Sequence, residues 1–163
     1  MNTFVALDFE TADRGRDSAC SIGLVRVEDN QIVHRDSYLI RPPRDIFEFT
    51  YIHGIRWADV AEQPTFGELW NNIEDVINGA EFLAAHNASF DKGVLFACCK
   101  KHQIAEPKQK FICTVKLARK IWNIYPTKLP NVCDFLDIKL THHNAISDAE
   151  ACARIVMASE RFK

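Results

Sequence analysis

The stretch FVAL over residues 4–7 ends in two acids, Asp8 and Glu10. Its length and apolar character predict a buried strand over residues 3–8. Residues two apart on a strand point to the same side, with Cα atoms roughly 6.5–7 Å apart. Asp8 and Glu10 therefore aim at a common point just past the apolar part. Taken alone, this pair is also typical of a strand that runs out into solvent.

A third acid, Asp91, leads a helix that is predicted from about residue 88 to residue 102. Asp91 shares one helix face with the residues three, four and seven positions later, which are Val94, Leu95 and Cys98. That face is otherwise apolar. A buried carboxylate without a partner is costly, so Asp91 is expected to meet one.

A fourth acid, Asp148, occupies the same place on the last predicted helix, over residues 147–161. Asp148 is followed on one face by Ala151, Cys152 and Ile155. Ser147 and Glu150 fit a capping box, which explains them structurally. The helix dipole also favours an acid in the first turn. Two such helices together with the acidic strand are harder to ascribe to chance.

The rest of the chain alternates strand-like and helical patterns. Strands are predicted over 20–27 and 31–39, joined as a hairpin through residues 28–30, and over 82–85. Helices are predicted after Pro64 up to Asn78-Gly79, over 115–124 and over 129–136. This order favours an α/β sheet with helices packed on it. No linker divides it, so residues 1–163 are expected to form a single domain.

Four carboxylates at one end of a sheet would repel one another unless cations lie between them. All-oxygen ligands suit Mg²⁺ or Mn²⁺ better than zinc. Two such ions about 3.5–4 Å apart would form a site for phosphoryl chemistry. His143 lies five residues before Asp148, where an imidazole could take a proton from water.

These motifs resemble those of the DEDDh 3'→5' exonucleases. The resemblance is carried by Asp8-Phe-Glu10, by the segment HNASFD over residues 86–91, by His143 with Asp148, and by YIHGI over residues 51–55, which is similar to epsilon-type chains. It implies an RNase H-like α/β fold with a mixed sheet and helices on both faces. It also implies that Asp8, Glu10 and Asp148 bind one of two metal ions, with Asp8 touching the second and Asp91 nearby, and that His143 is the general base.

The resemblance further implies contacts to the substrate from Thr11, Glu48, His53, Asn87 and Phe90. Glu48 and His53 resemble residues that contact the terminal nucleotide, and Phe90 could pack on its base or sugar. Other readings stay open. Glu48 could be a surface acid, His53 a residue that shapes its loop, and Asn87 or Ser89 a helix cap. Phe9, Ala12 and Asp13 depart from the epsilon pattern, which puts the nucleotide contact in doubt.

Charge and cysteine usage set further bounds. The net charge is −2, which gives no general reason to expect nucleic acid. Residues 91–128 nevertheless carry nine Lys or Arg against two acids. There Lys116, Arg119 and Lys120 could follow a phosphate backbone or form a solvated helix face.

The six cysteines form no CxxC pair, and without an export signal they indicate reduced thiols in a cytoplasmic protein. No apolar stretch has transmembrane length.

The sequence thus predicts a metal-dependent 3'→5' exonuclease. It would hydrolyse phosphodiester bonds at the 3' ends of single-stranded DNA and release 5'-mononucleotides. The same chemistry on RNA ends, or a non-catalytic nucleic-acid-binding module, are the alternatives. The intact set of acids disfavours the second alternative. No polymerase-binding tail is visible after the last predicted helix, so a free-standing enzyme is expected and polymerase association is not indicated.

Overall fold

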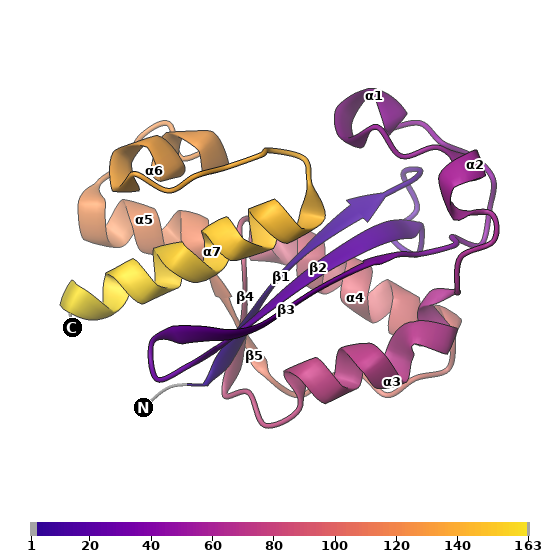
Figure 1. Ribbon diagram of the computed structural model, residues 1–163, viewed down its shortest axis with the longest axis horizontal. Coiled ribbons are helices and arrows are strands. Elements are labelled where there is room, and N and C mark those ends of the chain that lie inside the picture. The colour runs from indigo at the N-terminus through magenta and orange to yellow at the C-terminus, as the bar shows by residue number, and fades with distance from the viewer. Residues whose placement is uncertain (1–2, 163) are drawn as a thin grey trace.

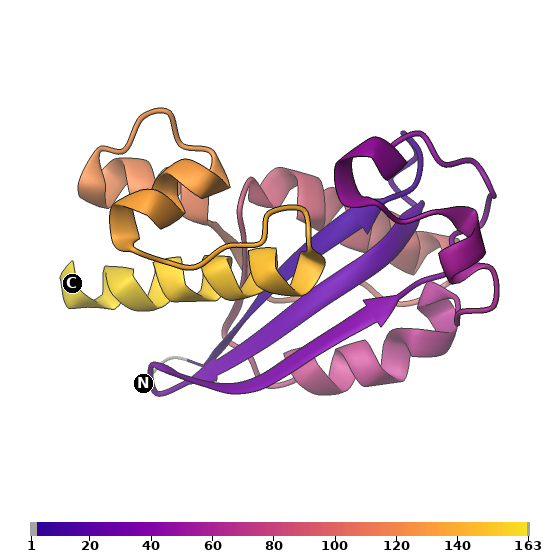
Figure 2. The same ribbon diagram turned by 45° about the horizontal axis from the view of Figure 1, so that its top comes forward.

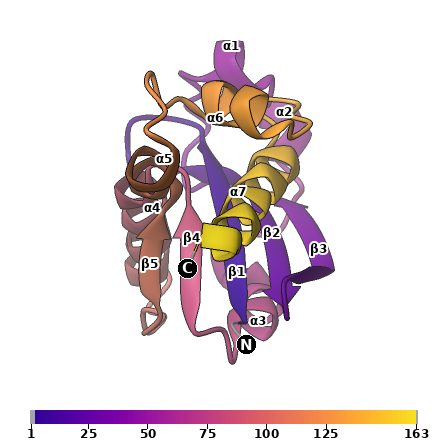
Figure 3. The same cartoon turned by 90° about the vertical axis from the view of Figure 1, so that its left-hand side faces the viewer.

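The computed structural model describes residues 3–162, and its sheet contains five strands in the order β3-β2-β1-β4-β5. Figure 3 shows these strands side by side. β1 pairs antiparallel with β2, and β2 antiparallel with β3, whereas β1 with β4 and β4 with β5 are parallel. The strands are β1 (Phe4–Thr11), β2 (Ala19–Glu28), β3 (Gln31–Leu39), β4 (Phe82–Ala85) and β5 (Lys110–Cys113).

Helices cover both faces of this sheet, and Figure 1 shows α3 and α7 on opposite sides of the strands. The helices are α1 (Thr50–His53), α2 (Trp57–Val60), α3 (Phe66–Ile77), α4 (Ala88–Lys101), α5 (Thr114–Trp122), α6 (Leu129–Leu136) and α7 (Ala145–Ser159), and a 3-10 turn spans Glu160–Phe162. The predicted mixed sheet with helices on both faces is therefore confirmed. The single-domain prediction stays a prediction, and its residues 1, 2 and 163 lie outside the described part.

The alternation of β1 distributes its side chains between two cores. Val5, Leu7 and Phe9 join the larger apolar cluster with α3 and α4. Phe4 and Ala6 face the other way and pack with the small residues of α7. Because strand side chains alternate, Asp8 continues the row that faces α7. This places the first acidic motif beside the helix that carries the third.

Most predicted elements are present, and the differences lie at their ends and in short segments. β1 extends to Thr11, so Glu10 lies within the strand rather than after it. The strand β5 was not predicted, because four residues that begin with Lys110 carry little pattern of their own. The short helices α1 and α2 were also not predicted.

The capping box predicted for the last helix is wrong. α7 begins at Ala145, and the side chain of Asn144 caps it by accepting a hydrogen bond from the Ser147 amide at 3.2 Å. The Ser147 hydroxyl instead accepts from the Thr141 amide at 2.8 Å. Glu150 pairs with arginines, Arg35 among them at 2.8 Å. The asparagine wins because it provides the same cap one turn earlier.

Two further observations bear on the sequence predictions. All six cysteines are free, and five of them are buried, with Cys113 only partly so. No helix in the described range 3–162 combines the length and apolar character needed to cross a membrane. The cytoplasmic location stays a prediction.

Candidate active site

The site lies where β1 extends beyond its parallel neighbour β4. β4 pairs with β1 only as far as Ala6 and then turns into α4. Asp8 and Glu10 lie on the part of β1 beyond this pairing. Asp8 is half-buried, and its Oδ2 atom is fully buried with no hydrogen-bond partner among the described residues. A buried carboxylate oxygen with nothing to bind is unusual and marks this position as incomplete without a further group.

Gly23 brings the start of α7 down onto the sheet beside Asp8. On β2, Gly23 lies directly opposite Asp8. A Cβ added at Gly23 would collide with the carbonyl group of Ala145 and with the Ile146 amide. The missing side chain therefore lets the first turn of α7 rest on the strand backbone. This close approach carries Asp148 to the end of β1.

Asp91 reaches the same point from α4. Its Oδ1 atom accepts a hydrogen bond of 3.0 Å from the Phe9 amide. Burial raises the pKa of Asp91 to about 7, although the Phe9 amide opposes the shift. The partner expected for this buried acid is therefore the backbone of the first motif. Val94, Leu95 and Cys98 on the same helix face are buried, as predicted.

Asp148 lies in the first turn of α7 and is 4% exposed. Its Oδ2 atom accepts a 3.1 Å hydrogen bond from the His143 amide. Ligand oxygens of Asp8, Glu10 and Asp148 all lie within 4.8 Å of one another. The three acids that the resemblance assigns to one metal ion are thus brought together, with Asp91 beside them.

The negative charges of these acids lie close together and are not offset by nearby Lys or Arg side chains of the described residues. Burial raises the pKa of Asp8 well above its ordinary value, and the charges of Asp91, Asp148 and Glu10 add to this. Burial and the neighbouring charges of Asp148 and Asp91 raise the pKa of Glu10 to about 8. Within residues 3–162, no Lys or Arg forms an ion pair with any of the four acids.

A divalent cation fits this arrangement. The orphaned Asp8 oxygen, the close carboxylates and the absence of a protein cation in the described part all favour a bound positive charge. The donor set is made of oxygen atoms, which Mg²⁺ and Mn²⁺ prefer. Asp8, Glu10 and Asp148 could hold such an ion.

The loop before α7 carries two histidines at the site. His143 has a left-handed backbone, with φ of 63°, and its ring stacks on that of His142 at a centroid distance of 3.7 Å. His142, not His143, donates a hydrogen bond from Nδ1 to Asp148, at 3.2 Å. Burial and the charge of His142 lower the pKa of His143. The sequence spacing singled out His143 alone. The sequence feature that could have suggested His142 is its position directly before His143.

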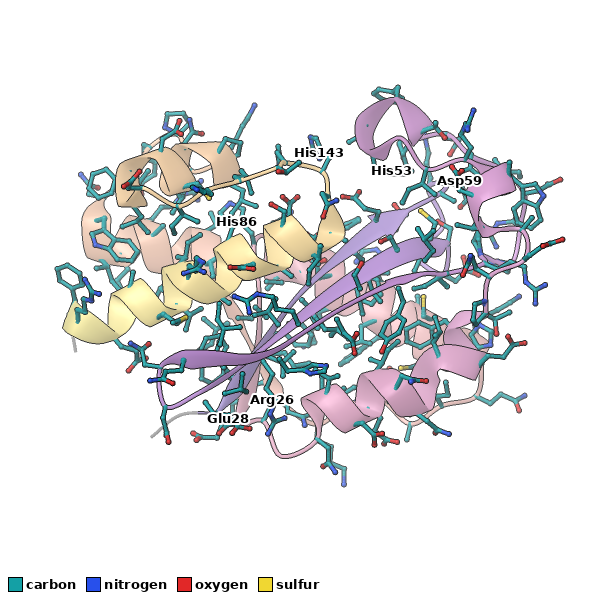
Figure 4. All side chains as sticks on the ribbon, viewed as in Figure 1. Arg26, Glu28, His53, Asp59, His86 and His143 are labelled. Atoms are coloured by element: carbon teal, nitrogen blue, oxygen red, sulfur yellow. The ribbon has the colours of Figure 1, made fainter. Side chains whose placement is uncertain are left out.

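A pocket of about 230 Å³ adjoins Glu10. It is lined by Phe9, Glu10, Thr11, Phe49, Ile52, His53 and Phe90. Three predicted substrate contacts, Thr11, His53 and Phe90, therefore share one pocket with Glu10. Figure 2 shows α1 and the loop before α7 on either side of the end of β1, and Figure 4 shows His53 and His143 on these two segments.

His53 has both ring nitrogens occupied. Nε2 donates to the Thr11 carbonyl at 3.0 Å, and Nδ1 accepts from the Ile55 amide at 3.0 Å. These bonds define a neutral ring, and burial lowers its pKa. His53 therefore joins α1 to the end of β1 and lines the pocket.

The other two predicted contacts lie outside this pocket. Glu48 is exposed, and its carboxylate accepts a hydrogen bond from the Arg14 amide at 3.1 Å. Asn87 stands at the N-cap position of α4 in a left-handed conformation, but its side chain makes no cap hydrogen bond. Its role as a cap is therefore limited to its backbone.

At the end of a mixed sheet, beside a loop with two histidines, lie four carboxylates that no Lys or Arg of the described residues balances. They define a site of the class that binds divalent metal for hydrolysis. The family profile described as exonuclease, of the RNase T type, matches residues 5–156. The chain belongs to this exonuclease family, which confirms the resemblance noted in the sequence.

Known proteins agree with this assignment. Exodeoxyribonuclease 10 of Escherichia coli (strain K12) is 37% identical over 148 residues, which cover 83% of this chain and 59% of that protein. The chain thus spans little more than half the length of this relative. The solved structure of exonuclease X in complex with 5' overhanging duplex DNA matches with a TM-score of 0.79 and 28% identity, over 100% of this chain and 93% of that one.

A third match concerns the fold alone. The nuclease domain of 3'hExo, a DEDDh family member bound to rAMP, has a TM-score of 0.82 at 18% identity, covering 99% of this chain and 92% of that one. The predicted RNase H-like architecture is therefore that of solved exonucleases.

Proposed function

We propose that this chain is a metal-dependent 3'→5' exonuclease that removes 5'-mononucleotides from the 3' ends of single-stranded DNA. The observation that carries the proposal is the set of four acids that no Lys or Arg of residues 3–162 pairs with, together with a buried orphan oxygen on Asp8. DNA is the proposed substrate because the relative at 37% identity is an exodeoxyribonuclease and the solved relative at 28% identity binds DNA.

Each acid has a proposed role. Asp8, Glu10 and Asp148 would hold Mg²⁺ or Mn²⁺, and Asp91 would support a second ion from beside Asp8. Bound there, such ions supply charge to polarise the phosphate and to acidify a water molecule. The hydrogen bonds from the Phe9 and His143 amides hold Asp91 and Asp148 in place before the ions arrive.

His143 is proposed as the general base. Its ring is exposed, and it is attached one turn before Asp148, so it can approach a water molecule held at the acids. Its lowered pKa keeps the ring neutral at pH 7, which is the form that accepts a proton.

The pocket beside Glu10 is proposed to receive the terminal nucleotide. Phe90 is exposed at its edge and can stack on a base, as aromatic side chains do in sites for single strands. Thr11 and the ring face of His53 would line the sugar side. Glu48 and Asn87 would contact the substrate only outside this pocket, since neither lines it.

The exposed side of α5 is the proposed path for the rest of the strand. Lys116, Arg119 and Lys120 are all exposed there. Arg119 lies over the Tyr125 ring at 5.2 Å, which combines a positive charge with an exposed aromatic face. Reversing the charges of Lys116 and Lys120 should raise KM and flatten its dependence on salt, whereas an unchanged slope would mean a merely solvated face.

The deciding experiment is gel-resolved digestion of end-labelled DNA and RNA oligomers with Mg²⁺, Mn²⁺ or EDTA. We expect stepwise shortening from the 3' end, 5'-monophosphate products, strong slowing by a bulky 3' block, and no reaction in EDTA. Full activity in EDTA, or cleavage of a closed single-stranded circle at a comparable rate, would contradict the proposal. Faster digestion of RNA would replace DNA by RNA as the substrate and leave the chemistry unchanged.

A further inference from the structure

His142, His143 and Asp148 form a second set of potential metal ligands, distinct in composition from the acids. One ligand atom from each of the three lies within 4.8 Å of the others. Both histidines are exposed, and Asp148 is buried. Asp148 thus belongs to two sets at once: one made of carboxylates alone, and one made of two imidazoles and a carboxylate.

The two sets favour different ions. Carboxylate oxygens suit Mg²⁺ and Mn²⁺, whereas imidazole nitrogen binds zinc at about 2.0–2.1 Å, with three protein ligands leaving one position for water. We propose that His142, His143 and Asp148 bind a zinc ion that shares Asp148 with the hydrolytic site and inhibits it.

The local geometry supports this site. His142 Nδ1 lies 3.2 Å from Asp148 Oδ2, close to the separation of about 3.3 Å between two ligands of one tetrahedral zinc ion. The stacked rings of His142 and His143 keep the two imidazoles side by side. The hydrogen bond from the His143 amide fixes the carboxylate toward them. Little movement is needed to assemble three ligands.

Inhibition follows from what zinc would occupy. A zinc ion on this set engages His143, the proposed general base, and draws on the charge of Asp148. The binding of zinc stands on the geometry alone, whereas the inhibition rests on the proposed function. The two can therefore be tested separately.

The first test measures zinc binding without nucleic acid, by competition with a chromophoric zinc chelator. His142→Ala should weaken zinc binding at least tenfold. The matched control is His34→Ala, because His34 is also exposed and also pairs with a carboxylate, Asp36 at 3.0 Å, but has no second histidine beside it. It should bind zinc as the unaltered protein does.

Two more variants keep this test decisive. Asp8→Asn should retain the zinc affinity, because Asp8 belongs only to the carboxylate set. His142→Asn, of similar polarity, should reproduce the loss if His142→Ala does not fold by circular dichroism. Equal zinc affinity in the unaltered protein and both His142 variants, or loss of zinc binding in Asp8→Asn, would overturn the site.

The second test measures digestion of a DNA oligomer in saturating Mg²⁺ while zinc is added, each variant being compared with its own zinc-free rate. The zinc concentration for half inhibition should rise at least tenfold in His142→Ala and stay unchanged in His34→Ala. An unchanged value in His142→Ala would refute the inhibition. A protein that binds zinc as expected but digests nothing would refute the proposed function and leave the zinc site standing.

Discussion

Two groups of acids lie near the same end of the sheet, and they differ in what balances them. In the loop after β1, Asp13 and Asp17 both bind the guanidinium group of Arg44, at 2.9 and 2.6 Å. We call this trio the arginine clamp. Hydrogen bonds from Arg44 and from the Gly15 amide outweigh the effect of burial and lower the pKa of Asp13. The hydrogen bond from Arg44 lowers that of Asp17.

The acids of the site, Asp8, Glu10, Asp91 and Asp148, have raised pKa values instead. The clamp holds its own cation and therefore serves the fold, joining the loop after β1 to the segment after β3. No Lys or Arg in the described part of the chain pairs with the site acids, so they favour a cation from solution. Acidic residues thus stabilise the structure in the clamp, where an arginine pairs with them. In the site, where no arginine of residues 3–162 pairs with them, they repel one another.

The largest effect is expected from Asp8→Asn. Removing a ligand of a site that works as a unit should lower kcat by more than about 10⁴-fold. It should also raise the melting temperature of the metal-free protein, because it removes one member of the repelling group. Digestion assays and thermal melts in EDTA measure the two effects.

Asp13→Asn is the matched control for Asp8→Asn. It should lower the melting temperature, since it weakens the arginine clamp. Nuclease activity that falls as far in Asp13→Asn as in Asp8→Asn would erase the distinction between the two groups.

His143→Ala is expected to have the next largest effect. Loss of general-base catalysis should lower kcat by about 10²–10⁴-fold while metal and oligonucleotide still bind. His142→Ala should lower kcat less, because its ring pairs with Asp148 rather than facing the reaction. If His142→Ala lowers kcat more than His143→Ala does, the motif is shifted by one residue. If neither variant changes kcat, the general base is another group.

The pH dependence of stability should separate the two groups next. The folded metal-free protein holds protons on Glu10 and Asp91 up to pKa values of about 8 and 7, whereas the unfolded chain releases them near pH 4. Their contribution is therefore full below about pH 4 and is lost progressively as the pH rises from there to about 8. The lowered pKa values of Asp13 and Asp17 act in the opposite sense, and their contribution is lost below about pH 4.

Thermal melts between pH 5 and pH 9 would test this linkage. In EDTA, the melting temperature should fall as the pH rises, and Mn²⁺ should remove most of the fall by neutralising the acids. A melting temperature that rises from pH 5 to pH 8 in EDTA would mean that the site acids are not repelling one another.

A smaller effect is expected from Gly23→Ala, which tests how α7 is placed beside Asp8. The added methyl group should push the start of α7 from the sheet and cost about 1–3 kcal/mol of stability. Activity should fall with it, because Asp148 moves. Gly67→Ala in α3 is the control, since its methyl group would meet only the His102 side chain. Equal activity in both variants would separate α7 placement from catalysis.

The smallest effect is expected from Arg44→Met, which removes the cation of the clamp. Arg44 is partly exposed, so the loss should be about 1–2 kcal/mol rather than the larger cost of breaking a fully buried pair. Chemical denaturation at pH 7 measures it. As the pH is lowered and Asp13 and Asp17 take up protons, the difference from the unaltered protein should shrink. A difference that is independent of pH would show that Arg44 acts through packing.

The sequence by itself determined which faces the key residues occupy. Alternation along β1 put Asp8 and Glu10 on one side, and helical spacing put Asp91 and Asp148 at the head of buried stripes. These conclusions hold because the periods of strands and helices are local properties of the backbone. The order of the three motifs also indicated the family, which the family match confirms.

Only the tertiary structure decided which residues meet across the chain. Nothing local links Gly23 to Ala145, Arg44 to Asp13, or His53 to the carbonyl of Thr11. Each of these contacts depends on how separate elements pack, and packing is set by the shape of the whole core rather than by spacing. For the same reason, spacing pointed to His143, whereas the folded loop turned the ring of its neighbour toward Asp148.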